Sequence, residues 1–352
     1  MLTLLLLACA PVTEELPPVV CDPAADQVQW IEGQLRFSSL SKALEIDAPW
    51  MTLCLGEGDF EVDEDLVELE SLTGSVHLIG RGPDLTRIVA SPELSEGDIQ
   101  LLWPGRPLEM VFQDLQIATP LEIAAQSLAM ESVTLQDMRA SGGLLRLDAR
   151  DLVLNDVTVQ GCHFAFGGIT TSEKLEGSRV EINRMRWLDN VSSSGLHMFF
   201  EGEREVRFNG LVVENASDLS SGYPMFYGFG EMELSGSSFY RARVGGPLLS
   251  ARLLRILDTE IMESRSSSGA LIQVAQGLHI ELSSIQDSRT LGSLLTAYKG
   301  SMFPVEIQIL ESQFGTQLPN SVTCDLSVSS TCVEESLGAV EEWSCSYCTE
   351  SL

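Results

Sequence analysis

The residues whose types and spacing could do chemistry are carboxylates and arginines that recur in the second half of the chain. Glu263 stands two residues before Arg265, and Asp287 stands two residues before Arg289. The second pair follows the first by 24 residues. Stacked coil over coil, these carboxylates and guanidinium groups can pair in a solvated ladder of ion pairs at a turn. The pattern by itself indicates such a ladder, and a catalytic role depends on a resemblance given below.

A second set of residues could bind a ligand by stacking. Long intervals in the chain contain aromatic runs beside acidic residues, and alternation along a strand would turn about half of each run outward. Exposed aromatic rings can stack on sugar rings, whereas buried ones would simply seal a wider part of the core. The sequence leaves both interpretations open. The binding candidates are His197, Phe199, Phe200, Tyr223, Phe226, Tyr227 and Phe229.

These residues are positioned by a repeat. Three similar segments begin at Gly246, Gly269 and Gly292, and with Gly222 they give glycine intervals of 24, 23 and 23 residues. Each unit holds two short apolar segments and is interrupted by Gly or Ser clusters, which favours strands over helices. A fixed period with short strands predicts a solenoid whose equivalent strands pair in parallel from coil to coil.

The same apolar pair, two residues five positions apart, recurs over most of the chain. The pairs begin at Phe112, Met130, Leu154, Ile182, Phe208, Leu234, Ile256, Ile280 and Ile309, and Ile88 is expected to extend the first column. This predicts an all-β, right-handed parallel β-helix of about nine to ten coils over residues 36–315. Asn155, Asn183 and Asn209 each follow the first anchor of consecutive coils, which predicts a stacked asparagine ladder.

Residues 36–90 carry a resemblance to a known class. Ser39 to Leu44 reads as a short capping helix. It is followed by a strand that leads to the turn Gly58-Asp-Phe60 and by a strand that ends in Gly80-Arg-Gly82. This order resembles the opening of the pectin lyase-like parallel β-helix proteins. That resemblance implies an arginine base beside acidic calcium ligands in catalytic members. It makes Arg265, Arg289, Glu263 and Asp287 the catalytic candidates of a polysaccharide lyase or hydrolase, and it leaves calcium open as a cofactor. The enzymatic signatures of pectinesterases and polygalacturonases are missing, so a non-catalytic protein is expected.

The amino terminus predicts export. Residues 1–9 read as a leucine-rich signal ending at Cys9, which resembles a bacterial lipoprotein signal with Cys9 as the lipidated residue, although no basic residue precedes the leucines. An ordinary secretory signal and a misplaced start remain alternatives. Residues 10–35 are Pro-rich and fit a tether. We therefore expect a bacterial cell-envelope or secreted protein whose membrane contact is a lipid anchor at Cys9 only.

The cysteines fit an oxidising compartment. Cys21 and Cys54 could join the tether to the first strand, and residues 316–352 form a cysteine-rich cap with Cys324, Cys332, Cys345 and Cys348. Those four allow three disulfide connectivities, and their spacing is unusual for zinc, so no metal site is predicted. Cys162 is expected to be a buried apolar residue.

The charge balance limits the partners. The chain has 51 acidic and 21 basic residues, so its net charge is −30. Such a surface repels the phosphate backbone and disfavours binding to nucleic acid. A polysaccharide or a cell-surface protein remains as the partner. Three functions stay open: a non-catalytic β-helix that binds glycans or proteins along its flank, a divergent polysaccharide lyase or hydrolase, and a purely structural or adhesive surface rod.

Overall fold

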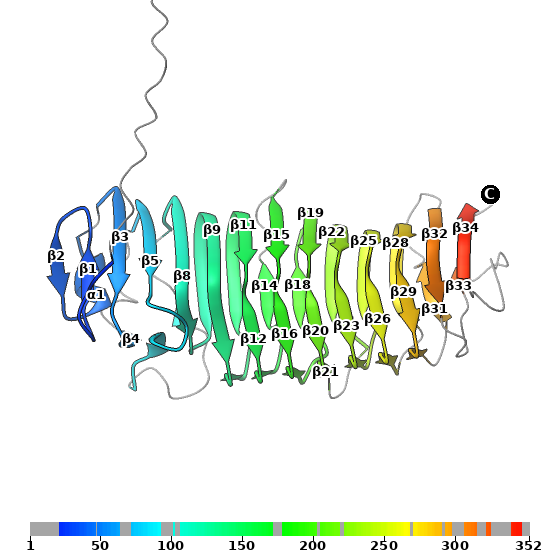
Figure 1. Cartoon of the computed structure of the whole chain (residues 1–352), viewed down its shortest axis with the longest axis horizontal. Coiled ribbons are helices and arrows are strands. Elements are labelled where there is room, and N and C mark those ends of the chain that lie inside the picture. Colours follow the sequence, from blue (N-terminus) through cyan, green and yellow to red (C-terminus); the bar gives the residue numbers. More distant parts are fainter. Residues whose placement is uncertain are drawn as a thin grey trace, which may run out of the picture.

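The chain forms a rod of stacked β coils in a computed structural model (Figure 1). The structure describes residues 21–46, 48–63, 72–92, 101–102, 106–171, 178–202, 205–218, 222–267, 270–290, 293–297, 306–314, 322–324 and 339–346. Within these ranges, 27 strands make one continuous sheet and seven short strands make a second. The fold is an all-β, right-handed parallel solenoid with about eight turns.

The first coils are irregular, because a hairpin and a helix start the stack. Their elements are β1 (Val28–Trp30), β2 (Leu35–Phe37), α1 (Leu40–Leu44), β3 (Trp50–Leu55), β4 (Gly58–Val62), β5 (Ser75–Ile79), β6 (Thr86–Ala90) and β7 (Leu101–Leu102). The pairing becomes parallel from β3 onward, with Leu53 beside Leu78 and Leu78 beside Phe112.

The main faces of the coils are formed by strands of three to 16 residues. They are β8 (Glu109–Ile117), β9 (Leu121–Gln136), β11 (Leu145–Asn155), β14 (Ile169–Thr171), β15 (Arg179–Asn183), β18 (Met198–Phe200), β19 (Glu205–Asn209), β22 (Phe226–Ser235), β25 (Leu249–Leu257), β28 (Ala270–Glu281), β31 (Ser293–Ala297) and β32 (Glu306–Phe314). The single strand β22 pairs with β18 through its first residues and with β19 through its last, so it turns a corner of the coil.

Two sets of short strands close each coil. One continues the large sheet: β12 (Thr158–Gln160), β16 (Arg186–Leu188), β20 (Val212–Glu214), β23 (Ser238–Tyr240), β26 (Glu260–Met262) and β29 (Ser284–Gln286). The other is the second sheet: β10 (Arg139–Ala140), β13 (His163–Phe164), β17 (Val191–Ser192), β21 (Ser217–Asp218), β24 (Arg243–Val244), β27 (Arg265–Ser266) and β30 (Arg289–Thr290). Because the second sheet starts only at Arg139, the regular turns number about eight rather than the nine or ten expected.

The apolar anchors stack as the repeat predicts. Leu154, Ile182 and Phe208 are in register on neighbouring strands, and all three are buried. Burying each such side chain contributes ~1.5–3 kcal/mol, so these columns supply most of the stability. The expectation for Ile88 was wrong: it pairs with Ile117, in the column of second anchors, because a separate strand, β5, fills the place before Phe112.

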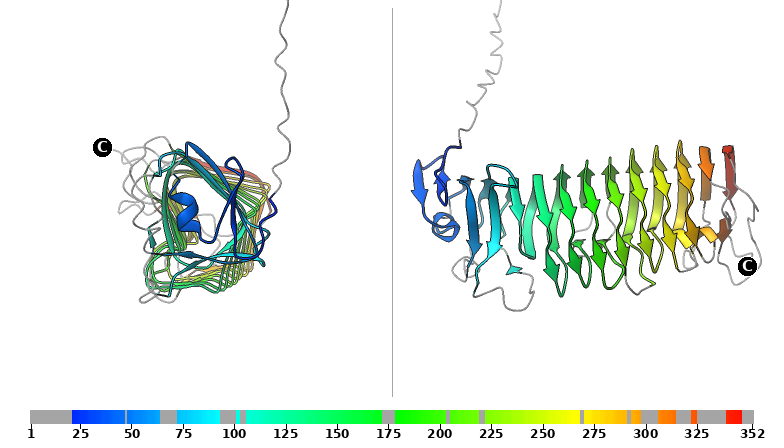
Figure 2. Two further views of the ribbon diagram at one scale, coloured as in Figure 1. Left: turned by 90° about the vertical axis from the view of Figure 1, so that its left-hand side faces the viewer. Right: turned by 60° about the horizontal axis from the view of Figure 1, so that its bottom comes forward.

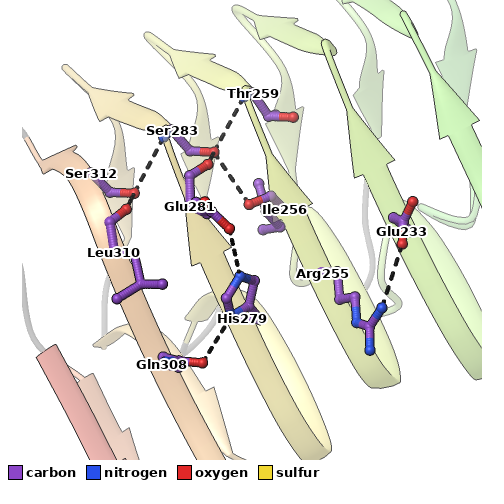
Figure 3. Close-up of polar contacts among 10 residues, drawn as sticks. All are labelled: Glu233, Arg255, Ile256, Thr259, His279, Glu281, Ser283, Gln308, Leu310 and Ser312. Atoms are coloured by element: carbon purple, nitrogen blue, oxygen red, sulfur yellow. Dashed lines mark hydrogen bonds and ion pairs between the residues drawn. The ribbon is translucent and has the colours of Figure 1, made fainter. Parts of the chain in front are cut away.

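Two polar ladders run parallel to these columns. The amide of Asn183 donates to Asn155 and that of Asn209 donates to Asn183, both at 2.8 Å, which confirms the predicted asparagine ladder. A second ladder of hydroxyls follows the next corner, and Figure 3 shows part of it. There the Ser283 hydroxyl donates to Glu281 O at 2.7 Å and accepts from Thr259 N at 3.2 Å, so it satisfies two backbone groups of neighbouring coils.

Both ends of the stack are covered. The end-on view in Figure 2 shows α1 within the outline of the coils, as a capping helix requires. Ser39 caps α1 by accepting a hydrogen bond from Lys42 N, and Leu40 and Leu44 are buried. At the other end, β34 (Ala339–Ser346) pairs antiparallel to β32, and β33 (Val322–Cys324) pairs with β31. Antiparallel pairing ends the parallel ladder and protects its edge.

The predicted cysteine roles have different outcomes. Cys21 and Cys54 form a disulfide, with their Cα atoms 5.4 Å apart. Cys162 is fully buried, and burial raises the pKa of its thiol to about 11, so it is a core residue. Cys9, Cys332 and Cys348 lie outside the described residues, and only the backbone is described at Cys324 and Cys345. Pairing among the four C-terminal cysteines therefore stays a prediction.

Buried aromatic side chains pack around Trp187 and His197 in the core of the rod. Trp187, fully buried, donates its indole N–H to Nδ1 of His197 at 2.9 Å, and His197 Nε2 lies 3.1 Å from Ser217 O. Since Nδ1 accepts, Nε2 must carry the proton, and the ring is neutral. Burial lowers the pKa of His197 to about 3.

Leu282 provides a test of the corner geometry. Its φ is 51°, in the left-handed region, and its side chain is 56% exposed, while Gly236 and Asp258 occupy equivalent corners with positive φ. Because Asn tolerates this region better than Leu, Leu282→Asn should raise the free energy of unfolding by about 0.5–1 kcal/mol. Urea unfolding measures the change. The matched control, Leu108→Asn, removes an equally exposed leucine (52%) without positive φ and should give no gain. Equal effects of the two substitutions would contradict the strain argument.

His197 should make stability depend on pH. Its folded pKa lies below the value of about 6.5 in an unfolded chain. Only the unfolded state then takes up this proton, so the contribution is complete above pH ~6.5 and is lost as pH falls from there toward 3. The loss is at most ~1.4 kcal/mol per pH unit. Urea unfolding of the wild type and His197→Gln should show a steeper acid loss in the wild type. Parallel profiles would mean that His197 takes up a proton in the folded state.

Candidate functional site

The outward side chains of β22 change character along the strand. They alternate with buried residues and run from Tyr227 and Phe229 to Glu231 and Glu233. The register against β25 is irregular between Gly228 and Glu231, where the strand turns the corner. One strand therefore joins an aromatic surface to an acidic one.

Three aromatic rings gather at the first part of this line, and we name Phe199, Tyr227 and Phe229 the aromatic cluster. Phe199 and Tyr227 lie on paired strands and stack with centroids 5.6 Å apart and an interplanar angle of 16°. Phe229 lies 4.9 Å from Tyr227 and 5.9 Å from Phe199, and it is 45% exposed. Rings that remain partly exposed while packing on one another offer a firm apolar surface.

A hollow of about 750 Å³ adjoins the acidic part of the line. It lies on the outer face formed by β19, β22, β25, β28 and β32. Its lining consists of Glu205, Glu231, Met232, Glu233, Leu253, Leu254, Arg255, Leu257, Gln276, Gly277, Leu278, His279, Glu281 and Gln308. Because Glu231 belongs to both the outward line of β22 and this lining, the aromatic cluster and the hollow adjoin at the corner of that strand.

Most charged groups of the hollow have a partner. Arg255 Nη1 lies 3.8 Å from Glu233, and His279 lies 3.1 Å from both Glu281 and Gln308 (Figure 3). Glu205 pairs with Arg207 on its own strand. These are surface pairs, worth ~0–1 kcal/mol each, so they orient side chains more than they stabilise the fold.

Glu231 is different. It is exposed, and within the described part of the chain no hydrogen bond or ion pair reaches its carboxylate. It stands between Phe229 and Glu233 on the outward side of β22. The hollow therefore presents one carboxylate that is available to a ligand next to the aromatic cluster.

The seven predicted binding residues divide between core and surface. His197, Phe200 and Phe226 are fully buried, so they cannot stack on a ligand at the surface; they pack inside the wide coils. The aromatic cluster holds three others, and Tyr223 is 56% exposed just before β22. Both interpretations of the aromatic runs thus apply, each to different residues.

The four catalytic candidates lie on another part of the rod. Arg265 and Arg289 are in register on β27 and β30, and Glu263 and Asp287 occupy the preceding corner with positive φ. All four are exposed and none lines the hollow. Glu263 lies 3.2 Å from Arg241, as a corner ladder of ion pairs requires. A catalytic role for these residues stays a prediction.

The line of residues that crosses the hollow was not predicted from the sequence. Glu233, Arg255, His279 and Gln308 are in register, and each immediately precedes the first apolar anchor of its coil. That constant position was the signal. In the described ranges, no group of three His, Cys, Asp or Glu residues is arranged to hold a metal ion. The described part of the chain also holds no helix with the length and apolar character of a membrane span.

Comparisons with known proteins give little beyond these observations. No protein-family model matches the sequence, and no curated protein matches it. Two solved structures are similar over most of the chain. PfbA, a surface adhesin of Streptococcus pneumoniae, is 9% identical, with 78% of this chain and 85% of that chain covered and a TM-score of 0.38. The A-module of the mannuronan C-5 epimerase AlgE6 of Azotobacter vinelandii is 14% identical, with 81% and 89% covered and a TM-score of 0.33.

Proposed function

We propose that this protein is an exported, non-catalytic β-helix that binds a polysaccharide along its flank, over the aromatic cluster and the hollow beside it. The observation that carries the proposal is the outward line of β22, in which two partly exposed aromatic rings are followed by two carboxylates. Sugar rings have an apolar face and hydroxyls at their rim, so they match a surface of this composition.

The shape of the surface fits an extended ligand. Phe199 and Tyr227 come from neighbouring coils, and the hollow continues across four further strands along the rod. The carboxylates of the hollow, His279 and Gln308 supply hydrogen-bond acceptors and donors for the hydroxyl groups of a sugar chain. A chain of sugar residues could therefore contact the rings and the hollow at the same time.

A disulfide supports the part of this proposal that concerns export. The Cys21–Cys54 disulfide belongs to an oxidising compartment, which agrees with the signal expected in residues 1–9. Attachment through a lipid on Cys9 would place the rod at the bacterial envelope, where polysaccharides are abundant; secretion would bring it to the same ligands. The resemblance to pectin lyase-like proteins remains one of architecture.

Removal of the rings should weaken binding without unfolding the protein. Tyr227→Ala and Phe229→Ala should each lower the affinity for a bound polysaccharide ~3- to 10-fold, because each deletes stacking worth ~0.5–1.5 kcal/mol. A glycan array identifies the ligand, and calorimetry then measures each variant. Trp50→Ala is the matched control, since Trp50 is 47% exposed on β3, far along the rod, and its removal should leave the affinity unchanged.

The same experiment separates the other functions. A wild-type protein that binds no glycan would leave a structural rod, and affinities unaffected by both ring variants would show that the surface lies elsewhere. Release of reducing ends or unsaturated products from a bound polysaccharide, abolished by Arg265→Ala, would establish the lyase or hydrolase instead.

A further inference from the structure

We infer that the preferred ligand is an amino sugar, held by stacking on the aromatic cluster and by an ion pair between its ammonium group and Glu231. This inference rests on the proposed function and names the class of polysaccharide that the same surface takes. Its basis is the juxtaposition of Phe229 and Glu231, which are successive outward residues of β22.

The geometry suits one sugar residue. Phe229 and Glu231 are two residues apart at the corner of β22, so their Cα atoms lie within ~7 Å of each other, which is comparable to the distance across a hexose ring and its substituents. A ring stacked on Phe229 and Tyr227 would therefore lie within reach of the Glu231 carboxylate at that corner. A positively charged substituent on that edge would pair with Glu231, whereas a neutral hydroxyl would form only an ordinary hydrogen bond.

Glu231 is the carboxylate best suited to this role. Glu233 lies beside Arg255, Glu281 beside His279 and Glu205 beside Arg207, so each of these carboxylates already has a partner. Glu231 has no such partner within the described residues and is already exposed. An ammonium group can pair with it without breaking an existing interaction.

The surrounding charge favours the same ligand and disfavours acidic ones. Four carboxylates line the hollow, against Arg255 as its one lining arginine and His279. The whole chain carries a net charge of −30, which repels polyuronates and attracts polycations. The hollow therefore favours a positively charged ligand. The stacked arginines Arg265 and Arg289 would instead favour a negatively charged one, such as a polyuronate.

Calorimetry with three soluble hexamers tests the inference: glucosamine, N-acetylglucosamine and galacturonate. The assay is made at mildly acidic pH and low salt, so that the amines are charged. The wild type should bind the glucosamine hexamer ~2- to 5-fold more tightly than the N-acetylated one, the range expected for an exposed ion pair, and the galacturonate hexamer more weakly than either. Glu231→Gln should equalise the first two affinities, and Glu260→Gln, an exposed carboxylate on β26, should preserve the difference.

The outcomes distinguish the two proposals. Equal wild-type affinities for the two hexosamine hexamers, or tighter binding of galacturonate, would overturn the amino-sugar inference and leave glycan binding in place. A difference that survives in Glu231→Gln would overturn the role of Glu231. Binding of no hexamer by the wild type, together with no signal on the glycan array, would overturn the proposed function itself.

Discussion

The whole structure depends on the in-register stacking of equivalent residues in successive coils. A single coil cannot bury its own apolar side chains, so each contributes stability only through contact with its neighbours. The column through Leu154, Ile182 and Phe208 shows the consequence, because each fully buried residue packs directly on the next. The register that satisfies the core also aligns the asparagine and hydroxyl ladders.

That register also builds the candidate site. Once Leu234, Ile256 and Ile280 are stacked inside the rod, the residues just before them must form an outward column, and Glu233, Arg255 and His279 become neighbours. No residue of the hollow needs a special loop to reach its position. The corner within β22 is the exception: it brings the aromatic cluster, which belongs to one face, next to the carboxylates of another.

The sequence predicted the parts of the fold that repeat. Apolar anchors, the asparagine ladder and the capping helix all follow from residue type at a fixed interval, and the Cys21–Cys54 pair follows from the position of two cysteines near the start. The number of regular turns was overestimated from the sequence. The first coils have the apolar pairs on which the count was based, but they lack the strands of the second sheet. Ile88 was misplaced because β5, earlier in the same coil, supplies the partner of Phe112, and β6 then pairs with the second-anchor position of β8.

The candidate site was only partly predictable. Alternation correctly divides Phe199 from Phe200, but the sequence alone does not say which of the two faces inward. His197 precedes its strand, and its hydrogen bond to the buried Trp187 decides its orientation. The hollow depends on side chains from five strands at once, together with the irregular register of β22, and no single stretch of sequence displays that combination.

The most direct measurement is the thermal stability of a protein that lacks one complete coil. Ser235 and Leu257 are in-register neighbours, so deletion of residues 236–257 joins the chain at equivalent points of two coils. If the coils are equivalent, the shortened protein should keep the circular dichroism spectrum of a β protein. It should also unfold cooperatively, with a thermal midpoint close to that of the full chain. Deletion of residues 236–246 removes half a coil and should abolish folding. If both deletions unfold the protein alike, the coils are not equivalent units and the stacking account is contradicted.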